Sequence, residues 1–286
     1  MKIKINGKPA DITLETEKTV GEVLAGIHQW LDSTKETAGF FVSGLEIDGK
    51  SYGVLSLDEA FELSLKGLSF INVKTSSWAE LMLEALVGLK NDLSAYESRT
   101  AEEQKNFRDN WEKSAAAVFI MEHDRDLYGV VQKTLKESPF SGSSLSFSTA
   151  GAAALVAERI REIENPMREM TSLKPFAEEI AKRLEDLPLD MQTGKDQKAA
   201  ETITVFSSLV EKIFRLIFLF RHFRADIDTI EVSSMISEFS AALKEMIAAY
   251  ENKDTILVGD LAEYELAPRL LGLIKTLSAC KTEEKS

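Results

Sequence analysis

Apolar residues repeat with two different periods along this chain, and the period changes once, near residue 75. In the N-terminal part, residues such as Ile3 and Ile5 alternate with polar residues around an Asn-Gly pair. Alternation of this kind around Asn-Gly predicts a β-hairpin. Beyond residue 75 the apolar residues recur every three or four positions, which is typical of amphipathic helices. The sequence therefore predicts an α+β protein, with a small α/β domain at 1–75 and a mostly α-helical bundle domain at 76–286.

The elements expected in residues 1–75 are, in order, two strands, a helix, two strands, a short helical turn and a last strand. Thr19 and Glu22 form a predicted capping box at the start of the helix, whose apolar face is expected to include Trp30. The order and size of these elements resemble the β-grasp, or ubiquitin-like, fold. This resemblance implies a module that more often binds partners than catalyses, although a fold does not fix a function.

The rest of the chain carries helical patterns with few interruptions. Ser76 or Ser77 caps the first helix, and Thr100, with Glu103 as its capping-box partner, opens a second that is expected to continue to residue 137. Ser138–Ser148 is rich in serine, glycine and proline, which predicts a flexible loop. Further helices are expected at 150–164, 167–184 with a kink or break at Pro175, 196–224, 226–250 and 255–279, with a polar connection at 188–195. Asp254 is expected to cap the last of these helices.

The charge balance is strongly acidic. The chain has 34 Lys and Arg residues against 47 Asp and Glu residues, which gives a formal net charge of −13. Nucleic-acid binding depends mainly on basic side chains that neutralise phosphates, so this composition argues against a nucleic-acid partner. The strongest apolar run, Ile213–Phe220, contains Arg215 and is far shorter than the roughly 20 residues of a membrane span. We therefore expect neither nucleic-acid binding nor membrane insertion.

Linear motifs for chemistry do not occur in the sequence. The chain begins with a strand pattern and lacks the apolar core of a signal peptide, which favours a cytoplasmic location. Its one cysteine, Cys280, can form neither an internal disulfide nor a cysteine-based metal site. His28, His123 and His222 lack a second histidine three or four positions away, as zinc-binding helices have. We expect no cofactor, no metal site and no catalytic residue from these motifs.

One group of carboxylates lies around His123. Glu122, His123 and Asp124 are adjacent on an expected helix, so their side chains point in different directions and cannot bind one ion together. Glu122 and Asp126 share a face and could bind a cation with help from another helix. A solvated polar face is the simpler interpretation of this group.

The most distinctive segment lies in the last expected helix. Asp260, Glu263 and Tyr264 fall at positions i, i+3 and i+4 on one face, and Glu265 lies beside them. Pro268 removes a helical hydrogen bond and frees the carbonyl of Tyr264. These five residues predict an acidic, tyrosine-containing groove for a partner or ligand; the alternative is a kinked core helix with capped carboxylates. The segment resembles C-terminal stretches of uncharacterised bacterial proteins, and no activity follows from that resemblance.

Together these features favour a non-enzymatic protein–protein interaction protein, such as an adaptor, a scaffold or a chaperone-like protein, with an unknown partner. Surplus apolar helix faces could also drive homodimerisation. The alternative is an enzyme, or a small-ligand or metal-binding protein, that uses carboxylates within the helical domain. Asp260, Glu263 and Glu122 would be the first residues to test for such a role.

Overall fold

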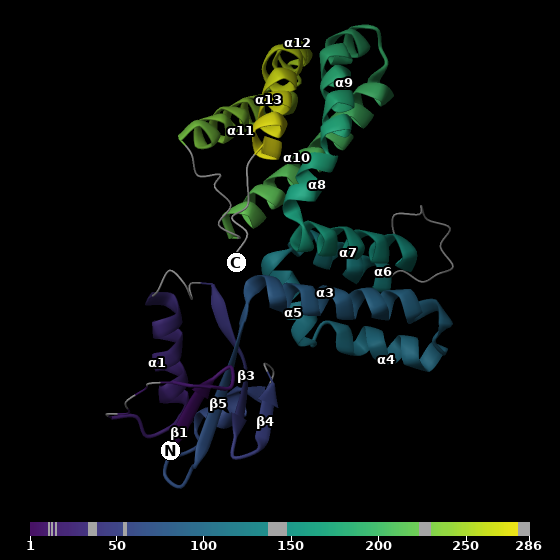
Figure 1. Cartoon of the computed structure of the whole chain (residues 1–286). Helices are drawn as coiled ribbons and strands as arrows, with labels where there is room; N and C mark the ends of the chain where they lie inside the picture. The colour runs from purple at the N-terminus through teal and green to yellow at the C-terminus, as the bar shows by residue number, and fades with distance from the viewer. Residues whose placement is uncertain are drawn as a thin grey trace. The chain divides into compact units, whose positions relative to one another are not determined.

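The protein is described by a computed structural model that covers residues 1–10, 12, 14, 16–33, 39–53, 56–136, 148–222 and 230–279. These residues form an α+β structure, with a five-stranded sheet near the N-terminus and helices in the rest of the chain (Figure 1). The structure divides into two compact units, residues 1–160 and residues 161–286. Residues 138–147 of the expected flexible loop lie outside the described residues.

The sheet contains the five expected strands in the expected chain order. Its strand order is β2-β1-β5-β3-β4, with β1 parallel to β5 and the other neighbours antiparallel. The second strand is shorter than expected and ends at Pro9, although the N–H of Ala10 still donates to the carbonyl of Ile3 at 3.0 Å. The elements of this part are β1 (Lys2–Ile5), β2 (Lys8–Pro9), α1 (Val20–Ser33), β3 (Phe40–Ile47), β4 (Lys50–Gly53), α2 (Asp58–Phe61) and β5 (Phe70–Ser77).

Local sequence signals explain how the sheet and helix α1 are built. Asn6 and Gly7 both have positive φ, 50° and 78°, as the two-residue turn of a right-twisted hairpin requires. The Thr19 hydroxyl accepts a hydrogen bond from the backbone N–H of Glu22, and the Glu22 carboxylate accepts one from the N–H of Thr19. The predicted capping box at α1 is therefore confirmed.

Helix α1 buries one face against the sheet, and Trp30 is not on it. Its side chain is 46% exposed, so the prediction that placed it on the apolar face is wrong. Trp30 lies at the edge of the buried face, three positions after the buried Ile27, where much of a large ring extends beyond the sheet contact. The buried core of this part is shared by α1 and the strands and includes Val20, Val23, Leu24, Ile27, Leu31, Leu45, Ile71 and Val73.

The next helices along the chain follow the expected pattern except at 100–137. The predicted helix at 100–137 is wrong, because three helices replace it. Ser114 accepts a hydrogen bond from the N–H of Ala117, and Asp124 accepts one from the N–H of Leu127, so each residue caps a new helix. The helices are α3 (Trp78–Ala95), the 3₁₀ turn η2 (Tyr96–Ser98), α4 (Ala101–Trp111), α5 (Ala115–His123), α6 (Arg125–Lys136) and α7 (Thr149–Glu164).

Asp124 also makes a buried ion pair within the first unit. Its Oδ2 lies 2.9 Å from Nε of Arg159, and both side chains are nearly buried. The ring of His123 packs against the ring of Phe119, with centroids 4.5 Å apart. Glu122, His123 and Asp126 are exposed, which agrees with the simpler interpretation of a solvated polar face, whereas Asp124 is nearly buried and belongs to the packing.

The second unit consists of helices packed around α9 (Figure 1). Helix α9 contacts α8, α10, α12, η4 and α13. The apolar run at 213–220 lies in α10 and is mostly buried, and no helix within the described ranges is long and apolar enough to cross a membrane. The elements are α8 (Pro166–Ser172), α9 (Lys174–Gln192), α10 (Asp196–His222), α11 (Ile230–Glu251), α12 (Thr255–Asp260), the π-helix η4 (Leu261–Leu266) and α13 (Ala267–Ala279).

Helix α9 continues where a polar connection was expected. The break at Pro175 is confirmed, because α8 ends at Ser172 and Pro175 lies in the first turn of α9. The predicted connection at 188–195 is wrong in its first half, since α9 passes through Pro188 to Gln192. Asp190 in this last part is buried and bonded to the ammonium groups of two lysines, which offsets the hydrogen bond lost at Pro188. The two lysines are Lys195 and Lys198.

Close packing of α12 on α9 should make Gly259 intolerant of any side chain. A Cβ atom at position 259 would lie 3.0 Å from Cβ of Pro188, and both atoms belong to packed helices. We expect Gly259→Ala to lower the free energy of unfolding by about 1–3 kcal/mol, measured by urea denaturation. Gly272→Ala is the matched control, because its Cβ would meet only the flexible end of Met235. Equal stability of the two variants would contradict this account.

Candidate functional site

The last helix of the second unit contains a π-helical turn at the segment singled out from the sequence. Asp254 caps α12 by accepting a hydrogen bond from the N–H of Leu257 at 3.0 Å, as expected. The helix then widens over η4 before α13 resumes, with Pro268 as the second residue of α13. Proline cannot donate to the carbonyl four residues earlier, so the regular ladder is interrupted here. Single π turns inside α-helices occur frequently at functional sites.

Four residues spaced by four form an exposed stripe along this helix. They are Ile256, Asp260, Tyr264 and Pro268. Ile256 is 72% exposed and Tyr264 is 64% exposed. In a regular α-helix each step of four overshoots one turn by about 40°, so such a stripe would wind around the helix. The wider π turn reduces this drift and keeps the four side chains on one side, while buried residues of the same segment face α9 and α11.

The acidic residues next to Tyr264 act on its hydroxyl group. A hydrogen bond to the Glu263 carboxylate, together with the negative charges of Glu263 and Asp260, raises the pKa of Tyr264 above its ordinary value. Glu265 does not belong to this group, because its carboxylate pairs with Arg269 one turn further along the helix. The structure therefore brings together Asp260, Glu263 and Tyr264 and separates Glu265 from them.

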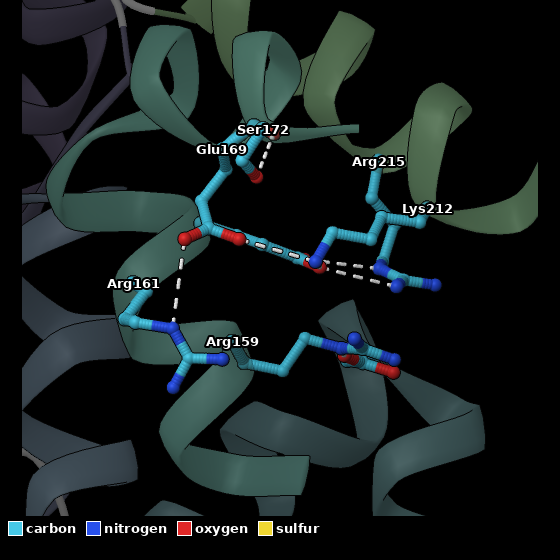
Figure 2. Close-up of polar contacts among 8 residues, drawn as sticks. Arg159, Arg161, Glu169, Ser172, Lys212 and Arg215 are labelled. Atoms are coloured by element: carbon cyan, nitrogen blue, oxygen red, sulfur yellow. Dashed lines mark hydrogen bonds and ion pairs between the residues drawn. The ribbon is translucent and has the colours of Figure 1, made fainter. Parts of the chain in front are cut away.

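A second arrangement of charges in the same unit was not predicted. Glu162 of α7 accepts two hydrogen bonds from Arg215 of α10, at 3.1 Å from Nε and 3.2 Å from Nη2. Lys212 Nζ lies 3.7 Å from Glu162 and donates to Glu169 of α8 at 3.1 Å. Glu169 also faces Arg161, with Nε 3.5 Å away (Figure 2). These five side chains form one ion-pair network that joins α7, α8 and α10.

The burial of Glu162 determines what the ion-pair network contributes to the structure. The Glu162 side chain is 1% exposed, so its charge is removed from water and depends on Arg215 and Lys212 for compensation. All three cations are engaged with carboxylates, which makes the network a structural junction more than a binding site. The available sequence signal was Arg215 itself, because an arginine inside an apolar helical run requires a buried acidic partner.

Carboxylates do not gather into a metal centre in the part of the chain that the structure describes. No group of three or more His, Cys, Asp or Glu side chains there could hold a metal ion. His222 lies at the end of α10, and its side chain and Cys280 are outside the described residues. The arrangement around Tyr264 therefore offers hydrogen-bonding and charge recognition on an open surface.

Two family models match separate parts of the chain. The TP0873 N-terminal domain matches residues 1–77, and Domain of unknown function (DUF8042) matches residues 168–276. Each covers less than half of the 286 residues, so each is a similarity of one part of the chain. Searches of curated proteins and of solved structures find no significant match. The second range contains the exposed stripe, in agreement with the expected likeness to uncharacterised proteins.

The pKa of Tyr264 offers a direct test of its contact with Glu263. In Glu263→Gln the carboxylate charge is lost, so ionising the phenol no longer places two negative charges side by side. We expect the pKa of Tyr264 to fall towards its ordinary value. Ultraviolet titration of each protein against the same protein carrying Tyr264→Phe isolates this residue. An unchanged pKa in Glu263→Gln would contradict the contact.

The buried network predicts an unequal response to single and double substitutions. Arg215→Met leaves Glu162 buried and undercompensated, so we expect unfolding to become easier by about 3 kcal/mol in urea denaturation. Arg215→Met combined with Glu162→Met should recover much of that loss, because it removes the stranded charge.

A surface pair provides the control for this comparison. Arg183 pairs with Glu179 on the outside of α9, and Arg183→Met should cost no more than about 0.5 kcal/mol. If Arg215→Met lowered the free energy of unfolding no more than Arg183→Met does, the network would not stabilise the structure.

Proposed function

We propose that this chain is a non-enzymatic interaction protein of the adaptor, scaffold or chaperone-like kind, which binds a protein partner through the exposed stripe. The observation that carries the proposal is the pair of large, highly exposed side chains, Ile256 and Tyr264, on either side of Asp260. Exposed apolar groups next to charges are typical of interaction surfaces. Tyrosine is also among the residues that contribute most to binding at protein interfaces.

The charges near the stripe indicate the chemistry of the partner. Asp260 and Glu263 surround Tyr264, so a matching surface should present Lys or Arg beside an apolar pocket. Two copies of the chain would bring these carboxylates together, and like charges across an interface oppose binding. A basic partner protein is therefore preferred to a homodimer through this surface.

For the N-terminal part we propose a β-grasp-like, ubiquitin-like domain at 1–75, followed by the helical domain at 76–286. Support comes from the strand order β2-β1-β5-β3-β4, the parallel pairing of β1 with β5, and the shared core of α1 and the sheet. That core draws on residues up to Val73, just before the proposed boundary. Within the helical part, the compact units divide between Ile160 and Arg161.

The alternative, an enzyme or ligand-binding protein that uses these carboxylates, has less support. Such chemistry requires carboxylates enclosed with a substrate or an ion, where burial tunes their pKa. Asp260 is exposed to solvent, and Glu263 is half-buried and bonded to Tyr264. The same geometry suits recognition of a cationic group on another protein.

The test begins with the purified full chain as an affinity bait, and any partner identified is then purified and titrated against variants. We expect Tyr264→Ala and Asp260→Lys each to weaken binding at least about tenfold, and added salt to weaken it further. Asp186→Lys is the matched control, because Asp186 is an exposed carboxylate on α9, outside the stripe.

Two results would overturn the proposal. One is that no partner is recovered and native mass spectrometry shows only monomer. The other is that a partner binds all four proteins with equal affinity, which would place its contact elsewhere on the chain.

A further inference from the structure

A cavity in the first unit has a shape and lining unrelated to the exposed stripe. It measures about 420 Å³ and lies between α3 on one side and α4 with α5 on the other. Ligand pockets in proteins commonly measure roughly 300–1,000 Å³, are mostly apolar and carry a few polar groups that orient the ligand. This cavity fits that description, since aromatic and aliphatic side chains line it together with two carboxylates.

The wall formed by α3 carries the two carboxylates with a glycine between them. Glu84, Gly88 and Asp92 follow one another at intervals of four, so they share one side of the helix. A Cβ atom at position 88 would have nothing within 4 Å, so packing does not require glycine there. Glycine in a helix costs roughly 1 kcal/mol relative to alanine. Here it keeps the middle of the cavity open.

The opposite wall is aromatic. Phe107 and Trp111 of α4 and Phe119 of α5 line it. Trp111 is almost fully buried, and its indole nitrogen is buried without a hydrogen-bond partner among the described residues. The part of the ring that meets the cavity is therefore carbon. Such rings attract cations to their faces and aliphatic chains to their surfaces.

A cationic side chain of the protein itself already lies between a carboxylate and an aromatic ring at this cavity. The guanidinium of Arg99 lies over the ring of Phe107, 5.1 Å from its centroid, and also pairs with Oδ1 of Asp92. A carboxylate and an aromatic ring thus already share a positive group at one end of the cavity. At the other end, Glu84 is exposed and has no ion pair in the part of the chain that the structure describes.

The spacing of the two carboxylates favours a linear ligand. Glu84 and Asp92 are eight residues apart on α3, which corresponds to about 12 Å along the helix axis. An extended aliphatic chain advances roughly 1.2 Å per bond, so about ten bonds connect the two carboxylates.

We propose that this cavity binds a linear aliphatic polyamine. One terminal ammonium pairs with Glu84 and the other with the second oxygen of Asp92, while the carbon chain and its inner ammonium lie against the aromatic wall of Phe107 and Trp111. Spermidine has terminal nitrogens about that far apart when extended, whereas putrescine reaches roughly half the distance. The acidic surface of the protein adds a general attraction for such cations. Contact with the apolar walls favours the longer polyamine over the shorter one.

The carboxylate end is tested by calorimetric titration of the full chain with spermidine. We expect one saturable site, with tighter binding of spermidine than of putrescine. Glu84→Gln should weaken spermidine binding about tenfold, because a charge-assisted hydrogen bond is lost. Asp109→Asn is the matched control, since it removes the same charge from an exposed position of α4 outside the lining, and it should bind as the unchanged protein does.

The cavity itself is tested by filling it. Gly88→Leu should abolish binding, whereas Gly129→Leu should not, because Gly129 is an equally open helical glycine in α6 outside the cavity. The proposal is overturned if spermidine gives no saturable heat, if Glu84→Gln and Asp109→Asn behave alike, or if Gly88→Leu binds normally. Equal affinity for spermidine and putrescine would likewise overturn it, since a ligand too short to reach both carboxylates would then bind as well as one that spans them.

Discussion

The packing of the last helix on α9 is the contact on which the second unit depends. Gly259 lets α12 approach Pro188 closely, and the buried residues of η4 and α13 then continue along α9. Because one side of the segment is fixed in this way, the residues on its other side remain in solvent. The π turn permits both, since it absorbs the interrupted ladder before Pro268 and keeps Asp260 and Tyr264 on the outer side.

Buried carboxylates mark the places where helices meet within each unit. Asp124 caps α6 and pairs with Arg159 of α7 in the first unit. In the second unit Glu162 pairs with Arg215 of α10, and Asp190 closes the turn between α9 and α10. A buried pair adds little net stability compared with apolar packing, but a mispaired arrangement would strand a charge. These contacts therefore penalise alternative registers of helices whose apolar faces alone would tolerate sliding.

The features that were predicted correctly from the sequence are those that depend on residues close together in the chain. The capping boxes at Thr19 and Thr100, the Asn6-Gly7 turn and the cap at Asp254 all involve residues a few positions apart, and each is present. The continuation of α9 through Pro188 could not be predicted in the same way, because Pro188 packs against Gly259, which lies far along the chain.

In the candidate site, too, local spacing could be predicted from the sequence, whereas contacts between distant residues could not. Helical spacing identified Asp260 and Tyr264, but exposure depends on which side of the helix meets α9. The sequence pattern placed Glu265 beside these residues but gave no indication of its ion pair with Arg269. The cavity of the first unit gave no signal at all, since Glu84 and Gly88 become meaningful only when α4 and α5 are placed opposite α3.

The two proposed surfaces use the same chemistry, a carboxylate beside an aromatic ring, and this bears on specificity in an acidic chain. A net charge of −13 attracts every cation, but that attraction is screened beyond a distance of about 10 Å at 0.1 M salt. Contact with Tyr264, or with Phe107 and Trp111, depends on burial of carbon surface, which such salt does not screen. The binding that persists as salt rises is therefore the part that these aromatic side chains determine, and the part that disappears belongs to the overall charge.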